Sequence, residues 1–232
     1  MKKSKRYKEI KAKVEKREYS IGEAITFLKD NSKVKFDETV EVTMKLGIDP
    51  RKSDQMVRGT VFLPYGTGKK IKILVFAADD KEKEAKDAGA DYVGSDDIIE
   101  KIIKGWTDFD LAIAVPELMA KVGKIGKILG PKGLMPNPKV GTVTKNISKA
   151  VNDARKGRVE FKVDKTANLH IPVGKLSFSP EKTEENFLEI LREVIKLKPS
   201  SSKGTYIKTI YLSSSMGPSL KINVQETVKA MH

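Results

Sequence analysis

The sequence contains no cysteine and only two histidines, His170 and His232. The absence of cysteine excludes disulfides, thiolate nucleophiles and zinc ribbons. Two histidines that stand far apart in the chain argue against a multi-histidine metal site and against a catalytic triad. We therefore predict no catalytic residue, no metal site and no cofactor, in a protein of a reducing compartment.

Long apolar runs are missing as well. No segment approaches the roughly 20 apolar residues that a membrane-spanning helix needs. Residues 1–18 are basic but lack the apolar stretch of a secretory signal. The sequence thus predicts a cytoplasmic protein without membrane contact.

Positive charge, in contrast, is abundant. Lys and Arg number 45 against 31 Asp and Glu, which leaves a net charge of +14 over 232 residues. Residues 79–117 hold 5 basic and 12 acidic residues, whereas residues 118–158 hold 10 basic and 1 acidic. A protein that is charged only for solubility intersperses the two signs, and clustered Lys and Arg gain affinity for polyanions by releasing counterions. The charge pattern favours a nucleic-acid partner over simple solubility.

The hydrophobic pattern changes along the chain. Toward both ends apolar and polar residues alternate, as in residues 38–47, which predicts strands with one buried face. Ser20 and Glu23 form a capping box that predicts a helix start, and residues 181–198 predict a long amphipathic helix. Between the ends, continuous apolar runs such as residues 71–77 alternate with helical patterns, which predicts a small doubly wound parallel sheet.

These two patterns predict two domains of different class. Residues 1–68 and 159–232 would form an outer α+β domain, and residues 69–158 an inserted doubly wound α/β domain. Periodicity alone does not prove that the two ends of the chain pack together, so the insertion is a hypothesis at this point.

Doubly wound domains often bind nucleotides, but this segment carries no nucleotide-binding motif. Gly66–Lys70 lacks the spacing of a phosphate-binding P-loop. Asp79, Asp80, Asp96 and Asp97 stand where strands meet helices, a position that suits a metal, but helix N-caps select aspartate there more often. A phosphate-binding enzyme of small molecules remains the alternative. A DNA-binding protein is disfavoured because nothing resembles a recognition helix and Arg is scarce beside Lys.

A few residues suit RNA instead. Lys35 and Phe36 precede the strand at 38–47, and Phe36 is either a stacking face or an ordinary core residue. Ser213–Pro218 ends a strand in small hydroxylated residues, which permits close approach to ribose and phosphate but equally describes a plain turn. Lys165 and His170 would line the same surface if the outer strands share a sheet.

Three motifs carry a family resemblance. Gly130–Lys139, GPKGLMPNPK, is followed by Val140–Val143 and resembles the signature of the ribosomal protein L-one family. Ser213–Pro218 and Lys35–Val40 resemble two further signatures of that family. Ser215 stands where the family usually has threonine, and the hydroxyl is retained. The resemblance runs from Tyr7 to the C-terminus, and the chain length is similar to that of bacterial members.

The resemblance implies an outer α+β domain that carries an inserted Rossmann-like domain. It implies a protein of the large ribosomal subunit that binds the 23S rRNA stalk near the tRNA exit site and aids release of deacylated tRNA. It also implies translational repression through the mRNA of its own operon, and a monomer when free. The implied RNA surface comprises Lys35, Phe36, Thr39, Lys165, His170, Ser213, Ser215, Met216 and Gly217, with Lys132 and Lys139 as a secondary RNA or tRNA contact.

Overall fold

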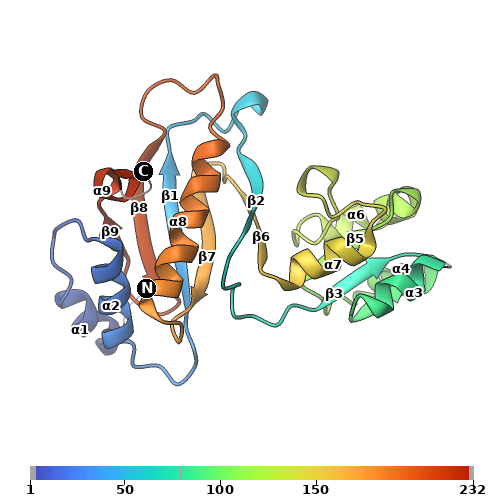
Figure 1. Ribbon diagram of the computed structural model, residues 1–232, viewed down its shortest axis with the longest axis horizontal. Helices are drawn as coiled ribbons and strands as arrows, with labels where there is room; N and C mark the ends of the chain where they lie inside the picture. The colour runs from blue at the N-terminus through green and yellow to red at the C-terminus, as the bar shows by residue number, and fades with distance from the viewer. Residues whose placement is uncertain (1–3, 79, 230–232) are drawn as a thin grey trace. The chain divides into compact units, whose positions relative to one another are not determined.

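The computed structural model describes residues 4–78 and 80–229, without the side chains of Asp80 and Lys139 (Figure 1). The chain divides into two compact units. The terminal unit contains the residues up to Gly68 and from Gly157 onward, and the inserted unit contains Lys69–Lys156. Within the described ranges, no helix is long and apolar enough to cross a membrane.

The terminal unit is an α+β structure. Its elements are α1 (Lys5–Ala12), α2 (Ile21–Asn31), β1 (Thr39–Leu46), η1 (Ser53–Gln55), β2 (Arg58–Phe62), β6 (Arg158–Lys162), β7 (Asn168–Lys175), α8 (Pro180–Lys196), β8 (Ile207–Ser214), β9 (Leu220–Ile222) and α9 (Val224–Lys229). Four strands form an antiparallel sheet in the order β7-β1-β8-β9, and β2 pairs with β6 in a separate antiparallel ribbon. Strands from both ends of the sequence therefore share one sheet.

One face of the four-stranded sheet is buried against helices. The predicted alternation in β1 is confirmed, because Val40, Val42, Met44 and Leu46 are all buried in one core with residues of α2 and α8. Figure 1 shows α8 in front of the sheet and α2 to the left of β1. The predicted capping box of Ser20 and Glu23 begins α2. The alternate residues of β1 are half-buried or exposed, so within the described part of the chain the opposite face of the sheet is open.

The inserted unit is doubly wound. Its elements are β3 (Ile73–Phe76), α3 (Asp80–Asp87), β4 (Tyr92–Gly94), α4 (Asp96–Ile103), β5 (Leu111–Ala114), η2 (Pro116–Leu118), α5 (Met119–Val122), η3 (Gly123–Ile125), α6 (Gly126–Leu129), η4 (Pro138–Val140) and α7 (Ile147–Arg155). The strands are parallel in the order β4-β3-β5. Leu74 and Phe76 pack in a core with α4, while Ile73 and Val75 pack in another with α7. Helices thus cover both faces, and the predicted fold class is confirmed.

Gly157 and Arg158 differ from the sequence-based boundary, which assigned them to the inserted domain. Arg158 pairs with Phe62 in the β2–β6 ribbon, and the N–H of Leu63 donates to the Gly157 carbonyl at 3.2 Å. Both residues therefore belong to the terminal unit. Sequence periodicity missed this because the pairing partner lies far away in the chain.

Candidate nucleic-acid interface

The open face of the four-stranded sheet consists of the residues of each strand that point away from the core. In β1, Thr39, Glu41, Thr43 and Lys45 point away from the core. The hydrogen-bonding register places their neighbours on either side: Lys175 beside Thr39; Pro172 and Ser213 beside Glu41; His170 and Tyr211 beside Thr43; Asn168 and Thr209 beside Lys45. At about 3.3 Å per residue, the face extends ~20 Å along β1. It is a polar strip of hydroxyl, amide and charged groups.

The turn after β8 closes one end of this strip. The N–H of Ser215 donates to the Thr39 carbonyl at 3.0 Å, and the Ser215 hydroxyl accepts the Thr39 N–H at 3.1 Å. Met216 follows with its side chain 49% exposed. A Cβ at Gly217 would lie 2.3 Å from the Ser214 hydroxyl oxygen, so a side chain at this position would displace that hydroxyl. Thr39, Ser213, Ser215, Met216 and Gly217 are therefore neighbours, as a shared surface requires.

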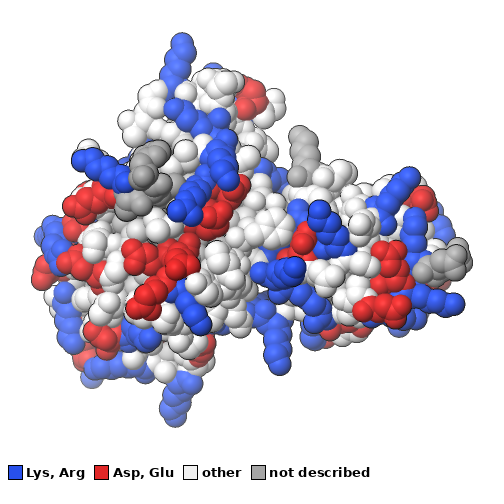
Figure 2. Space-filling view, in the orientation of Figure 1, with Lys and Arg blue, Asp and Glu red and all other residues white. Residues whose placement is uncertain are grey.

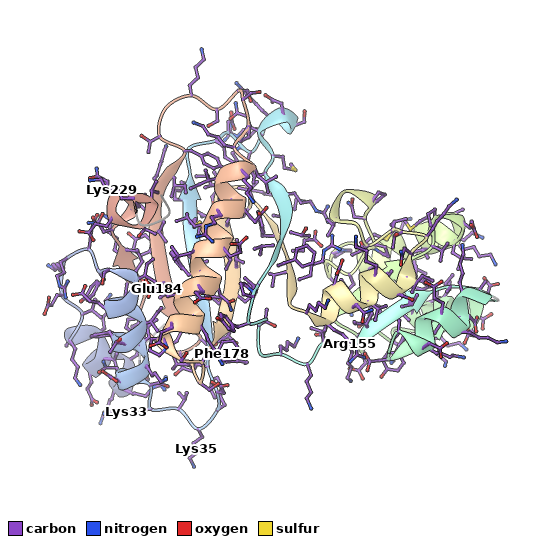
Figure 3. The ribbon with its side chains drawn as sticks, viewed as in Figure 1. Lys33, Lys35, Arg155, Phe178, Glu184 and Lys229 are labelled. Atoms are coloured by element: carbon purple, nitrogen blue, oxygen red, sulfur yellow. The ribbon has the colours of Figure 1, made fainter. Side chains whose placement is uncertain are left out.

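Phe36 and Lys35 lie in the loop before β1. The Phe36 side chain is 55% exposed, so of the two alternatives left by the sequence the structure favours an accessible ring over a core residue. Lys35 extends from the same loop into solvent (Figure 3). An exposed aromatic ring beside a free ammonium group is the combination that stacks on a base and pairs with phosphate.

Lys165 and His170 lie toward the opposite end of the strip from Met216. Lys165 is exposed in the turn between β6 and β7, beyond Asn168 and Lys45. His170 lies on the strip itself, with Nδ1 3.1 Å from the Thr43 hydroxyl and Nε2 3.8 Å from an Asp164 oxygen. These two residues therefore share the sheet face with the turn after β8 but do not touch that turn.

Asp164 shapes the turn that carries Lys165. Its carboxylate accepts the N–H groups of Asn168 at 2.7 Å and Thr166 at 2.8 Å. Desolvation by burial acts to raise the pKa of Asp164, but these hydrogen bonds outweigh it and lower the pKa to about 2. The turn is thus held by an ionised carboxylate at neutral pH.

The basic loop of the inserted unit, residues 130–143, is only partly available for contact with a polyanion. The Lys132 ammonium donates to the Thr107 hydroxyl at 2.6 Å, although the side chain is exposed. The side chain of Lys139 lies outside the described part of the structure, and its backbone is in η4. Asn137 and Thr142 close this loop, since the Asn137 N–H donates to the Thr142 hydroxyl at 2.7 Å. The loop is ordered by its own hydrogen bonds.

The aspartates at the starts of the helices of the inserted unit have a structural role. Asp96 and Asp97 lie in the first turn of α4, where Asp97 accepts the Ser95 N–H at 3.2 Å. Asp79 falls outside the described residues. Among the side chains described, no group of three or more His, Asp or Glu could hold a metal ion. The N-cap of α4 is Ser95, so the expectation that Asp96 or Asp97 caps this helix is wrong, and both carboxylates lie in its first turn instead.

Several residues of the strip were not singled out from sequence. Glu41, Thr43, Lys45 and Tyr211 all share the open face with the predicted residues. The outward positions of the predicted alternation at 38–47 were a signal for three of them. Tyr211 carried no such signal, because its place opposite Thr43 depends on pairing between the two ends of the chain.

The fold and this surface define a two-unit protein, α+β with an inserted α/β unit, whose open sheet face suits a polyanion. The sequence model of the Ribosomal protein L1p/L10e family matches residues 28–218. The chain belongs to this family, as the three motifs predicted.

Two relatives match this chain over nearly its full length. The chain is 52% identical over 231 residues to "Large ribosomal subunit protein uL1" of Thermobifida fusca (strain YX), covering 99% of this chain and 98% of that protein. It is 55% identical over 227 residues to the protein of the same name from Paenarthrobacter aurescens (strain TC1), covering 97% of each. The chain is thus a structural protein of the large ribosomal subunit and not an enzyme, which excludes the phosphate-binding alternative.

Proposed function

We propose that this protein binds the stalk of 23S rRNA near the tRNA exit site through the open sheet face of its terminal unit. The contact would include Lys35, Phe36, Thr39, Lys165, His170, Ser213, Ser215, Met216 and Gly217. We further propose that it aids release of deacylated tRNA and represses its own operon by binding a similar element in the mRNA. As a ribosomal component it works in the cytoplasm.

The observation that carries this proposal is the polar strip ending in the Ser215–Gly217 turn. Hydroxyl and amide groups on an open sheet reach ribose 2′-hydroxyls and phosphates without a bulky side chain intervening. Exposed Phe36 and Met216 stand at the same end and offer apolar contact to unstacked bases. Charged groups alone would bind any polyanion, whereas this combination discriminates RNA from DNA.

The helical side of the terminal unit is unsuited to RNA. Helix α8 carries Glu181, Glu184, Glu185, Glu189 and Glu193. Figure 2 shows carboxylates gathered over this side of the unit. Glu189 and Glu193 are paired with Arg192 and Lys196, and repulsion between phosphate and the other carboxylates of α8 supports an approach from the sheet side.

The basic loop of the inserted unit, with Lys132 and Lys139, is the proposed secondary contact with RNA or tRNA. Such a contact contributes mainly salt-dependent affinity, since lysine binds phosphate as a point charge. Free in solution, the chain is proposed to be a monomer.

The test is binding of the full chain to a stalk rRNA fragment and to DNA of the same sequence across a salt series. Tight binding with a large preference for RNA is expected, because 2′-hydroxyl contacts are lost in DNA. Weak and equal binding to both, falling steeply with salt, would contradict the proposal.

A further inference from the structure

A buried carboxylate lies directly beneath the proposed RNA surface. Glu38 is only 2% exposed, although it immediately precedes β1 and neighbours the exposed Asp37. Burying a charge is unfavourable unless hydrogen bonds compensate it. The partners of Glu38 therefore indicate what the charge does.

Donors from two segments surround this carboxylate: one lies just before Glu38 in the sequence and the other lies far away, at the end of β8 and in the turn that follows it. The Ser32 hydroxyl, at the end of α2, donates to Oε1 at 2.6 Å. The Met216 N–H donates to Oε2 at 2.9 Å, and the buried Ser214 hydroxyl also bonds Glu38. Glu38 thus ties the turn after β8 to the end of α2 and to the start of β1.

Arg6 binds the carbonyl of Met216, the residue whose N–H donates to Glu38. Its guanidinium donates to the Met216 carbonyl at 3.3 Å. The backbone of Met216 therefore donates its N–H to a carboxylate and accepts a hydrogen bond from a guanidinium at its carbonyl. Bonds with a charged partner are roughly twice as strong as neutral ones, so the backbone is fixed while the side chain points outward.

The carboxylate is ionised at neutral pH. Burial raises the pKa of Glu38, but the hydrogen bonds from Ser214, Ser32 and the Met216 N–H outweigh this effect and hold the pKa below its usual range. Glycine at position 217 leaves room for the hydrogen bond between Ser214 and Glu38, because a Cβ there would displace the Ser214 hydroxyl.

We propose that Glu38 is a positioning residue for RNA binding, which with Arg6 holds the Met216 backbone so that the turn after β8 presents its exposed groups to RNA. Glu38 does not itself contact RNA, because it is buried. This inference rests on the proposed function of the sheet face.

The sign of the change in RNA affinity caused by one substitution tests the inference. Glu38→Gln removes a negative charge near a polyanion, so electrostatics alone predicts equal or tighter RNA binding. A positioning role predicts weaker binding, because the amide group offers one oxygen where the carboxylate offered two. We expect at least a fivefold loss of affinity for the stalk rRNA fragment, with the salt dependence unchanged since no phosphate contact is removed.

Asp30→Asn is the matched control. Asp30 is an exposed carboxylate on α2 of the same unit, and its substitution removes the same charge. Its affinity should equal or exceed that of the wild type. Ser32→Ala keeps the carboxylate and removes one donor, so it should lower affinity in the same direction by less, which keeps the inference testable should Glu38→Gln fail to fold.

A double-mutant cycle separates positioning from general stability. Glu38→Gln should cost less affinity in a Met216→Ala background than in the wild type, because part of what Glu38 positions is then absent. Affinities are measured well below the melting temperature of each variant. Wild-type affinity in folded Glu38→Gln, or full additivity with Met216→Ala, would overturn the inference. Failure of the wild type to prefer RNA would instead overturn the proposed function.

Discussion

Ser215 and Thr39 hold each other through two hydrogen bonds, one from the Ser215 N–H at 3.0 Å and one to the Ser215 hydroxyl at 3.1 Å. The pair extends the β1–β8 ladder by one step past Ser214. The hydroxyl retained at this position therefore has a structural role, and threonine would serve equally well. RNA contact by Ser215 would depend on this geometry.

Ser215→Ala should remove the acceptor for the Thr39 N–H and lower the free energy of unfolding by about 1 kcal/mol. Urea denaturation measures the change. Ser215→Thr is the control and should preserve both stability and RNA affinity. A stability loss equal for Ala and Thr would contradict the role of the hydroxyl.

Met216→Asp should lower RNA affinity at least tenfold, about 1.4 kcal/mol, because a carboxylate would replace an apolar contact beside phosphate. Stability should change by less than about 0.5 kcal/mol, since about half of Met216 is exposed to solvent. Met56→Asp is a matched control, as Met56 is 48% exposed against 49% for Met216 but precedes the β2–β6 ribbon. Equal effects of the two substitutions on RNA binding would show that only charge matters.

Gly157→Ala should destabilise the terminal unit by about 3 kcal/mol, through a strained backbone and a collision. Gly157 has φ 96°, and an added Cβ would lie 2.4 Å from the Gly66 Cα. Gly204→Ala separates the two causes, because Gly204 has φ 79° with open space around it and should cost about 1 kcal/mol. Thermal unfolding of both variants gives the comparison; similar losses would rule out the collision.

Acid should weaken the turn at residues 164–168. The pKa of Asp164 is lowered to about 2 in the folded chain, below the ordinary value of 3.8. Its stabilisation is thus present above pH 4 and is lost as the pH falls toward 2. The stability difference between wild type and Asp164→Asn should shrink across this window. A carboxyl NMR titration of Asp164 with a midpoint near 4 would contradict the assignment.

Replacing residues 69–156 with a short glycine linker should leave a terminal unit that folds and binds the stalk rRNA fragment. The unit has its own core, and Gly66 and Gly157 lie in contact, so a short linker spans the gap. Circular dichroism checks folding and the same binding assay checks function. A folded terminal unit without RNA affinity would place the main contact on the inserted unit.

Local patterns predicted most elements because each depends on neighbours in the chain. The alternation at 38–47 required only a period of two, and the Ser20–Glu23 box only a spacing of three. The family motifs predicted only part of the candidate surface, the residues just before β1 and those of the turn after β8, and their contact with RNA stays a prediction. Helix α9 at the C-terminus was not predicted from the sequence.

The sequence by itself determined the element types, the two hydrophobic patterns, the basic charge and the family. Only the tertiary structure decided that β1 lies between β7 and β8, that Phe36 is exposed, and that Glu38 is buried beneath Met216. The physical reason is that element type follows from local periodicity. Strand order, burial of a charge and the hydrogen bonds of a turn instead depend on contacts between residues far apart in the chain.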